Sequence, residues 1–198
     1  MRIIGGQLKG KKLFTFQGKA IRPTSDRLRE SVFNILNGRV SNAVVLDLFA
    51  GTGALGLEAL SRGARSAVFI DNYKQAILLI RRNIQACGLD NISTVRYWDI
   101  KHDLNCIRSS VPVFDLVFMD PPYTQCLLKP TLYHLQHTGA LTPHACIVIE
   151  HSLKEGLPDV WPDFTCTDQR KYGKTNISFL TYNSKKLFHI RQPHFTET

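Results

Sequence analysis

The sequence predicts an α/β fold, in which a mostly parallel, doubly wound sheet carries helices on both faces. Short apolar runs alternate with amphipathic stretches of about 10–15 residues, the pattern of parallel strands joined by helices. A glycine-rich turn follows the first of these apolar runs. The chain has 198 residues, of which 43% are hydrophobic, so it can form one domain with a substantial core.

The first 40 residues predict a small extension ahead of the sheet. Residues 1–20 are basic and contain Gly5, Gly6 and Gly10, which suggests a hairpin or arm. A helix start follows at Arg22-Pro23-Thr24-Ser25-Asp26, where Thr24 or Ser25 can cap exposed amides. Gly38 can end this helix in a left-handed conformation. One apolar stripe is expected along it, made of Leu28, Val32, Ile35 and Leu36.

The rest of the chain predicts the sheet itself. Strands are expected at 44–48, 67–71, 94–98, 114–119 and 147–150, with helices from the glycine turn to about 63, at 73–87 and at 127–137. A terminal antiparallel hairpin is expected from 164–172 and 177–182, joined by Gly173-Lys174-Thr175. The complete sheet would then have seven strands. Residues 184–198 show no sustained periodicity.

Charge divides the chain into three parts. The net charge is +9, but residues 1–40 hold nine Lys and Arg against two acids, residues 41–169 hold ten against thirteen, and residues 170–198 hold six against one. Basic ends on a near-neutral body favour a polyanionic partner over a small neutral or cationic metabolite. We therefore expect a basic arm and helix extension at 1–40, a main domain at 41–183 and a basic tail at 184–198.

Several protein classes are disfavoured. No apolar run reaches the ~18 residues of a membrane span, and no signal peptide is visible, so a cytoplasmic location is expected. The five cysteines include no Cys-x-x-Cys pair and are expected to be reduced thiols. The seven histidines show no metal-ligand spacing, so no metal is expected.

The glycine turn predicts a nucleotide-type ligand. Gly51, Gly53 and Gly56 fit G-x-G-x-x-G between a strand and a helix, a pattern that dinucleotide cofactors also use. However, Asp47 lies in the preceding strand, where its charge would repel a phosphate and attract an ammonium or sulfonium group. S-adenosylmethionine is cationic and has no phosphates, so it is the expected cofactor. Phe49, within the turn, is assigned to the same site.

Two further acids follow the next strands. Asp71 ends the second strand at a distance from the glycines that is typical of an acceptor for ribose hydroxyls, although it could instead cap the next helix. Asp99 follows the third strand and could accept from the adenine amino group, although Asp103 lies nearby. Asn72 is assigned to this cofactor site as well.

The motif Asp120-Pro121-Pro122-Tyr123 carries the most specific chemistry. It follows the most hydrophobic strand, at the sheet edge where open α/β folds bind ligands. The two prolines stiffen the backbone and remove two amide donors. The Asp120 carboxylate, the Pro121 carbonyl and the flat Tyr123 ring together suit an exocyclic amine on a planar base. Such a site can hold the amine for in-line attack on an electrophilic methyl group.

These motifs, in this order, resemble class I S-adenosylmethionine-dependent methyltransferases that act on exocyclic amines. More narrowly, the chain resembles bacterial methyltransferases that make N2-methylguanine in 16S ribosomal RNA of the small subunit. The resemblance spans about residues 1–182 and rests on four segments: Arg2–Gly6 with Lys11, Arg22–Leu36, Leu48–Ala64 and Tyr172–Thr175. The Arg-Pro-Thr helix is its most specific element.

The resemblance implies a Rossmann-like fold and direct SN2 methyl transfer. It places the cofactor against Asp47, Gly51, Gly53, Asp71 and Asp99, and the guanine against Asp120–Tyr123. The basic arm and helix are expected to bind RNA through Arg2, Lys11, Arg22, Thr24, Arg27 and Arg29. This family commonly has Glu where Asp71 stands, which shortens the reach of the side chain here. The resemblance assigns no role to the basic tail at 184–198.

Other functions stay open at this point. The same four motif residues could hold the amine of adenine, as in an adenine-N6 methyltransferase acting on DNA or RNA. A non-catalytic RNA-binding protein is disfavoured by the intact Asp120 and glycines, and a nicotinamide-dependent oxidoreductase by Asp47 and Asp120. The substrate could be naked RNA or an assembled particle.

Overall fold

The computed structural model describes residues 1–16, 26–108, 114–122, 125–157 and 161–183. Its strands are β1 (Val44–Leu48), β2 (Ser66–Asp71), β3 (Ser93–Tyr97), β4 (Phe114–Met119), β5 (Leu141–Ser152), β6 (Phe164–Tyr172) and β7 (Thr175–Tyr182). Its α-helices are α1 (Asp26–Ile35), α2 (Ala54–Ser61), α3 (Lys74–Cys87) and α4 (Leu128–His137), with single 3-10 turns at Asp90–Ile92 and Asn105–Ile107.

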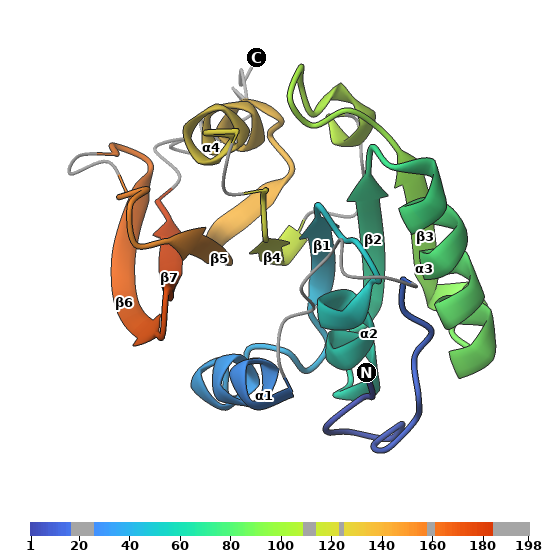
Figure 1. The fold of residues 1–198 in the computed structure, drawn as a ribbon. Helices are drawn as coiled ribbons and strands as arrows, with labels where there is room; N and C mark the ends of the chain where they lie inside the picture. Colours follow the sequence, from blue (N-terminus) through green and yellow to red (C-terminus); the bar gives the residue numbers. More distant parts are fainter. Residues whose placement is uncertain (17–25, 109–113, 123–124, 158–160, 184–198) are drawn as a thin grey trace, which may run out of the picture.

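All seven strands form one twisted sheet in the order β3-β2-β1-β4-β5-β7-β6 (Figure 1). Strands β1 to β5 all run parallel to one another, whereas β7 runs antiparallel to both β5 and β6. The predicted fold class is confirmed, including the C-terminal hairpin. Strand order reverses between β1 and β4, the position at which open α/β sheets bind ligands beyond their carboxyl ends.

Two apolar layers cover the two faces of the sheet. On one face the N-terminal arm, α1, α2 and α3 pack against side chains such as Val45 and Phe118. On the other, α4 packs against neighbours in the same strands, such as Leu46 and Val117. The alternation follows from the two-residue period of a strand, which turns successive side chains to opposite faces. Burial of strands on both sides explains their continuous apolar runs.

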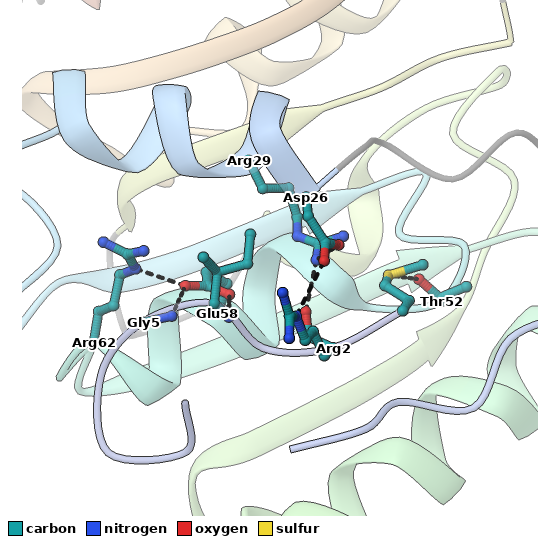
Figure 2. A network of polar contacts seen from close by, with 9 residues as sticks. Arg2, Gly5, Asp26, Arg29, Thr52, Glu58 and Arg62 are labelled. Atoms are coloured by element: carbon teal, nitrogen blue, oxygen red, sulfur yellow. Dashed lines mark hydrogen bonds and ion pairs between the residues drawn. The ribbon is translucent and has the colours of Figure 1, made fainter. Parts of the chain in front are cut away.

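Polar contacts to one buried carboxylate fix the N-terminal arm, residues 1–16, to α2. Glu58 is 0% exposed, and its two oxygens accept hydrogen bonds from the backbone amides of Ile4 and Gly5, both at 2.8 Å. The Arg62 side chain donates to the same carboxylate at 2.7 Å (Figure 2). A charge buried in this way is tolerated because it is paired with Arg62 and accepts three hydrogen bonds. The arm is therefore a structural part of the domain.

The arm has the hairpin character expected from its glycines. An isolated antiparallel bridge joins Arg2 to Lys12, and the amide of Ile3 donates to the carbonyl of Lys11 at 2.9 Å. Farther along, the side chain of Asn83 in α3 exchanges hydrogen bonds with the backbone of Phe14, at 2.7 and 3.1 Å. The two ends of the arm lie near Thr52, in the turn after β1: its Oγ1 donates to Met1 Sδ at 3.8 Å, and its carbonyl accepts from the Asn83 side chain at 2.9 Å.

One expectation about α1 is wrong. Ile35, predicted to belong to the apolar stripe, is 37% exposed, whereas Phe33 is 3% exposed and packs against Phe118 with ring centroids 5.6 Å apart. The last turn of the helix is followed by a turn through Gly38, whose φ of 76° is left-handed as expected. Ile35 therefore faces away from the sheet while Phe33 fills the space between α1 and β4.

No helix among the described residues is long and apolar enough to cross a membrane.

Candidate active site

A cavity of about 1280 Å³ opens at the carboxyl ends of the parallel strands. It brings together ten of the residues predicted for the site from separate parts of the sequence. These are Arg27, Asp47, Phe49, Gly51, Asp71, Asn72, Asp99, Asp120, Pro121 and Pro122. The volume exceeds the needs of one small ligand and is large enough for a nucleoside-sized cofactor beside a nucleobase.

The glycine turn between β1 and α2 forms one wall. Gly51 and Gly53 have φ values of 56° and 75°, a left-handed conformation that glycine adopts without strain. Phe49 lines the cavity in the same region, with a φ of 57° that costs a residue with a Cβ roughly 1–2 kcal/mol. Gly53 lies behind the wall, where it caps α2.

The amides of this turn are already used within the fold. The Gly51 amide donates to Asp71 Oδ2 at 2.8 Å, the Gly53 amide to the Ala50 carbonyl at 2.7 Å, and the Gly56 amide to Asp47 Oδ2 at 2.9 Å. A dinucleotide site instead directs such amides at a pyrophosphate. Two of the three amides here donate to carboxylates, so this turn disfavours the binding of a phosphate.

Asp47 is the most buried acid of the wall. It is 2% exposed, and burial raises the pKa of its carboxyl to about 8, an effect that the Gly56 amide partly offsets. Asp71 adds a smaller upward contribution to the pKa of Asp47 through repulsion. A carboxyl held in this state favours a positively charged neighbour, since a cation would stabilise its ionised form.

Asp71 and Asp99 stand at the ends of β2 and β3. Burial raises the pKa of Asp71, although its oxygens accept from the amides of Gly51 and Tyr73, both at 2.8 Å. Each oxygen retains a second lone pair, so Asp71 can still accept from a ligand hydroxyl. Asp99 Oδ1 accepts from the Asn72 side chain at 3.2 Å, which links the two strand ends.

Asp120, Pro121 and Pro122 form another part of the cavity wall, directly after β4. The pKa of Asp120 is raised well above its ordinary value, first by burial and then by repulsion from Glu150 and Asp47. Asp47 and Asp120 therefore approach the cavity from neighbouring strands on one face of the sheet. Tyr123 lies outside the described residues.

The predicted RNA contacts fall into different environments. Arg27 is exposed and lines the cavity, and Lys11 is exposed on the arm. Arg2 is exposed and lies 3.4 Å from Asp26, between its Nε and the Oδ2 of that acid (Figure 2). Arg22 and Thr24 lie outside the described residues.

The expected RNA contact of Arg29 is contradicted by its placement. Arg29 is 1% exposed, and its Nη2 donates to the Arg2 carbonyl at 2.7 Å and to Asp26 Oδ1 at 2.9 Å. Burial lowers the pKa of this guanidinium, although Asp26 and Glu58 counteract the effect. A side chain enclosed in this way cannot reach a phosphate, so Arg29 ties the arm to α1 instead.

Sequence reasoning missed several residues of the cavity. Phe16 lines it and pairs with Tyr73 at a ring-centroid distance of 6.1 Å. Glu150 lines it from β5 and could have been found, since it stands at the carboxyl end of a predicted strand, as Asp120 does. Other missed residues come from the arm, α1 and the β6–β7 turn, whose approach depends on tertiary packing; they are Met1, Thr15, Leu28, Ser31, Tyr172, Gly173 and Thr175. The rest adjoin the predicted motifs or lie in the loops after β3 and β4; they are Ala50, Thr52, Ala54, Leu55, Lys101, Gln125 and Leu127.

Within the part of the chain that the structure describes, no three His, Cys, Asp or Glu side chains gather closely enough to hold a metal ion. The described cysteines are all free thiols.

The sheet order, the glycine turn that faces carboxylates and the Asp-Pro-Pro wall together define a class I methyltransferase of Rossmann-like fold. Residues 1–181 match the family described as "Conserved hypothetical protein 95", and the chain belongs to that family. The match covers the arm as well as the sheet, and it ends just before the basic tail.

Named relatives agree with this class. The chain is 34% identical to "Putative rRNA methyltransferase YlbH" of Bacillus subtilis, over 90% of this chain and 97% of the relative. It is 37% identical to "Ribosomal RNA small subunit methyltransferase D" of Escherichia coli K12, over 81% of this chain and 79% of the relative. A solved structure, "Putative methyltransferase yhhF from Escherichia coli", superposes with a TM-score of 0.80 at 33% identity, covering 92% of this chain and 98% of that one.

Proposed function

We propose that this protein is an S-adenosylmethionine-dependent methyltransferase that modifies the exocyclic N2 amine of a guanine in 16S ribosomal RNA of the small subunit. The observation that carries the proposal is that Asp120-Pro121-Pro122 lines the same cavity as the carboxylate-facing glycine turn. The relatives named for small-subunit ribosomal RNA support the substrate class. Such a substrate would place the reaction in the cytoplasm.

The residues of the cavity fit a cationic cofactor. Asp47 supplies a carboxyl whose pKa is raised by burial and which a cation would stabilise in its ionised form. Asp71, Asn72 and Asp99 supply acceptors and a donor at the ends of the next two strands. S-adenosylmethionine, when bound, supplies an electrophilic methyl group that the base amine takes by SN2 displacement from sulfur. The glycine turn and Asp47 would hold the cofactor, with Phe49 closing the wall.

Asp120 and the Pro121 carbonyl would hold the amine. An exocyclic amine has two hydrogens, and these two acceptors can bind both, which directs the nitrogen lone pair out of the ring plane. The nitrogen gains positive charge as its new bond to carbon forms, and a nearby carboxylate stabilises that charge. The amine then loses one proton, for which Asp120 or solvent is a sufficient acceptor. Tyr123 would stack on the base.

The arm and α1 would form the RNA-binding part, as the division at residue 40 predicts. Arg27 is exposed at the cavity, and Lys11 and Arg2 are exposed on the arm. Arg22 and Thr24 belong to the same proposal. Arg29 is left out because it is buried.

The proposal is tested by transfer of a tritiated methyl group from S-adenosylmethionine to unmethylated 16S RNA, either naked or within small subunits, followed by digestion to nucleosides. The label is expected in N2-methylguanosine. Label in N6-methyladenosine would instead support the adenine-N6 alternative. Calorimetric titration with S-adenosylmethionine and with NAD should give binding only for the former, and tighter binding of NAD would overturn the cofactor assignment.

A further inference from the structure

The turn between β6 and β7 stands at the same edge of the sheet as the cavity. β7 runs antiparallel to β5, and its first residue, Thr175, pairs with Ser152, the last residue of β5. Because the cavity opens at the carboxyl ends of the parallel strands, this pairing brings the turn to the rim of the cavity. Tyr172, Gly173 and Thr175 accordingly line it. The turn is therefore part of the cavity wall, although it belongs to the outermost strands of the sheet (Figure 1).

Exposed lysines surround this turn. Lys171 is the last residue but one of β6, and Lys174 lies in the turn itself, immediately before Thr175; both side chains are exposed. Lys154 is also exposed and follows Ser152 by two residues, so it leaves the sheet at the same edge. Three cations from two separate segments of the chain thus come together beside the cavity.

The carboxylates of the same two segments do not neutralise these lysines. Asp168 Oδ1 lies 3.0 Å from Nε of Arg170, so these two residues form an ion pair within β6. Glu155 follows Lys154, and its Oε2 atom is buried. Among the described residues, no ion pair involves any of the three lysines. This part of the rim therefore carries a net positive charge.

The hairpin also holds half of the basic excess at the carboxyl-terminal end of the sequence. Residues 170–198 contain six Lys and Arg, and three of them belong to β6 and its turn: Arg170, Lys171 and Lys174. β7 ends at Tyr182, which pairs with Phe164 at the end of the hairpin remote from the turn. The cations of the hairpin are thus placed at the cavity by the sheet itself, independently of the tail.

A nucleotide held in the cavity needs cations at the rim. When its base reaches Asp120, its sugar and the two flanking phosphates remain nearer the opening, and each phosphate carries a negative charge. Arg27 and Lys101 already line the cavity as cations. Lysines on the β6–β7 turn would neutralise phosphates along a further part of the rim, which positions the RNA without reading its sequence.

We propose that the β6–β7 turn is a second RNA-binding element, in which Lys171 and Lys174 contact phosphates next to the target nucleotide. This inference rests on the proposed function and adds to it a contact surface that lies outside the first 40 residues. The RNA would then be held from the turn as well as from the arm and α1.

The test removes two charges and preserves the length of both side chains. Affinity is measured at several salt concentrations for whichever unmethylated substrate accepts the methyl group in the labelling experiment, naked 16S RNA or small subunits. In Lys171→Gln/Lys174→Gln, the slope of log affinity against log salt should fall by about 1.4 to 1.8, since one phosphate contact contributes about 0.7 to 0.9. Between about 50 and about 200 mM salt, this variant should lose about tenfold less affinity than the unaltered protein.

Two matched variants separate a local contact from a general effect of charge. Lys171→Arg/Lys174→Arg keeps both charges, so its slope should stay within about 0.5 of the unaltered value. Arg81→Gln/Lys129→Gln removes two charges from exposed positions of α3 and α4 that do not line the cavity, and its slope should also be preserved. An equal fall in this control would show that the slope reports net charge alone, and would overturn the assignment.

Calorimetric affinity for S-adenosylmethionine and the melting temperature check that each variant is folded. If Lys171→Gln/Lys174→Gln does not fold, Lys174→Gln alone, in the turn, should lower the slope by about 0.7 to 0.9. Absence of methyl transfer by the unaltered protein to either substrate would overturn the proposed function. Methyl transfer by the unaltered protein, together with an unchanged slope in the folded glutamine variant, would overturn only the RNA contact of the hairpin.

Discussion

The carboxyl of Asp47 accepts a hydrogen bond from the backbone amide of Gly56 at 2.9 Å, inside the fold. This contact joins the fourth residue of β1 to the first turn of α2, and so fixes the glycine turn between them. It also places a titratable group in the wall of the cavity with almost no access to water. The first two predictions concern its two partners.

Gly56→Ala should destabilise the protein by roughly 1–3 kcal/mol and weaken cofactor binding. A Cβ at this position would lie 2.3 Å from Phe69 Cε1 and 3.1 Å from Asp47 Oδ2, so both the core and the turn must shift. Urea unfolding measures the loss. Gly156→Ala is the matched control, because a Cβ there meets nothing within 4 Å, and equal stability of the two variants would refute the argument.

Asp47 should make the ligand-free protein less stable as the pH rises. Its pKa is about 8 in the fold and near 4 when unfolded, so between these values the folded state binds one proton more than the unfolded state. The free energy of unfolding then falls with pH by up to about 1.4 kcal/mol per unit, and the fall ends near pH 8. Asp71 and Asp120 act in the same direction.

Asp47→Asn isolates the contribution of Asp47, since the amide oxygen can still accept from Gly56. Urea unfolding at pH 5.5 and 7.5 should show a smaller loss of stability for Asp47→Asn than for the unaltered protein. Equal losses would mean that Asp47 does not titrate in this range.

Asp120→Ala should lower the rate of methyl transfer by roughly 100- to 1000-fold, the effect of losing one group that stabilises charge in the transition state. Affinity for S-adenosylmethionine should change little, and stability should not fall, because the change removes repulsion with Glu150 and Asp47. Single-turnover rates and calorimetry measure the two effects. Undiminished turnover would remove Asp120 from the mechanism.

Arg29→Ala should lower the stability of the protein, whereas Arg27→Ala should weaken its binding to RNA. Arg29 is buried and bonded to the Arg2 carbonyl and Asp26, so its loss should cost roughly 1.5–3 kcal/mol of stability. Arg27 is exposed at the cavity, so its loss should leave stability within ~0.5 kcal/mol. Arg27→Ala should instead reduce by about one the slope of log affinity for RNA against log salt. An unchanged slope would exclude a phosphate contact by Arg27.

Glu58→Ala should release the arm and cost about 3 kcal/mol, because it leaves the amides of Ile4 and Gly5 without their acceptor inside the fold. Trypsin should then cleave faster after Lys9, Lys11 or Lys12. Since Met1 and Phe16 line the cavity, cofactor affinity should fall as well. Glu58→Gln keeps an acceptor and should show a smaller effect; cleavage of Glu58→Ala at the unaltered rate would show that other contacts hold the arm.

Local sequence patterns predicted the sheet well. The run Val44–Leu48, the left-handed Gly38 after α1 and the hairpin turn at Gly173 each depend on interactions within a few residues, so the sequence expresses them directly. The alternation of strands and helices along the chain also specified a parallel sheet. A helix between two strands returns the chain to the end of the sheet where the first strand began, so the second strand runs parallel to it.

Side-chain environments in α1 were less predictable. Ile35 and Phe33 are both apolar and two residues apart, and only the position of β4 decides which of them is buried. Arg29 and Arg27 are the same residue type on the same helix, yet one is enclosed beneath the arm and the other faces the cavity. The local sequence does not show which of the two arginines is buried, because Arg29 is covered by the arm, which comes from more than ten residues earlier in the chain.

The sequence alone determined the fold class, the glycine turn with its acid and the Asp-Pro-Pro segment, since each is a contiguous pattern with a local physical cause. The tertiary structure decided which acids share a cavity. Asp47, Asp120 and Glu150 are far apart in the chain, and only the register of parallel strands brings their carboxyls to one edge of the sheet. It likewise decided that the basic arm of the first 16 residues is anchored by a buried glutamate, because that contact crosses more than fifty residues of sequence.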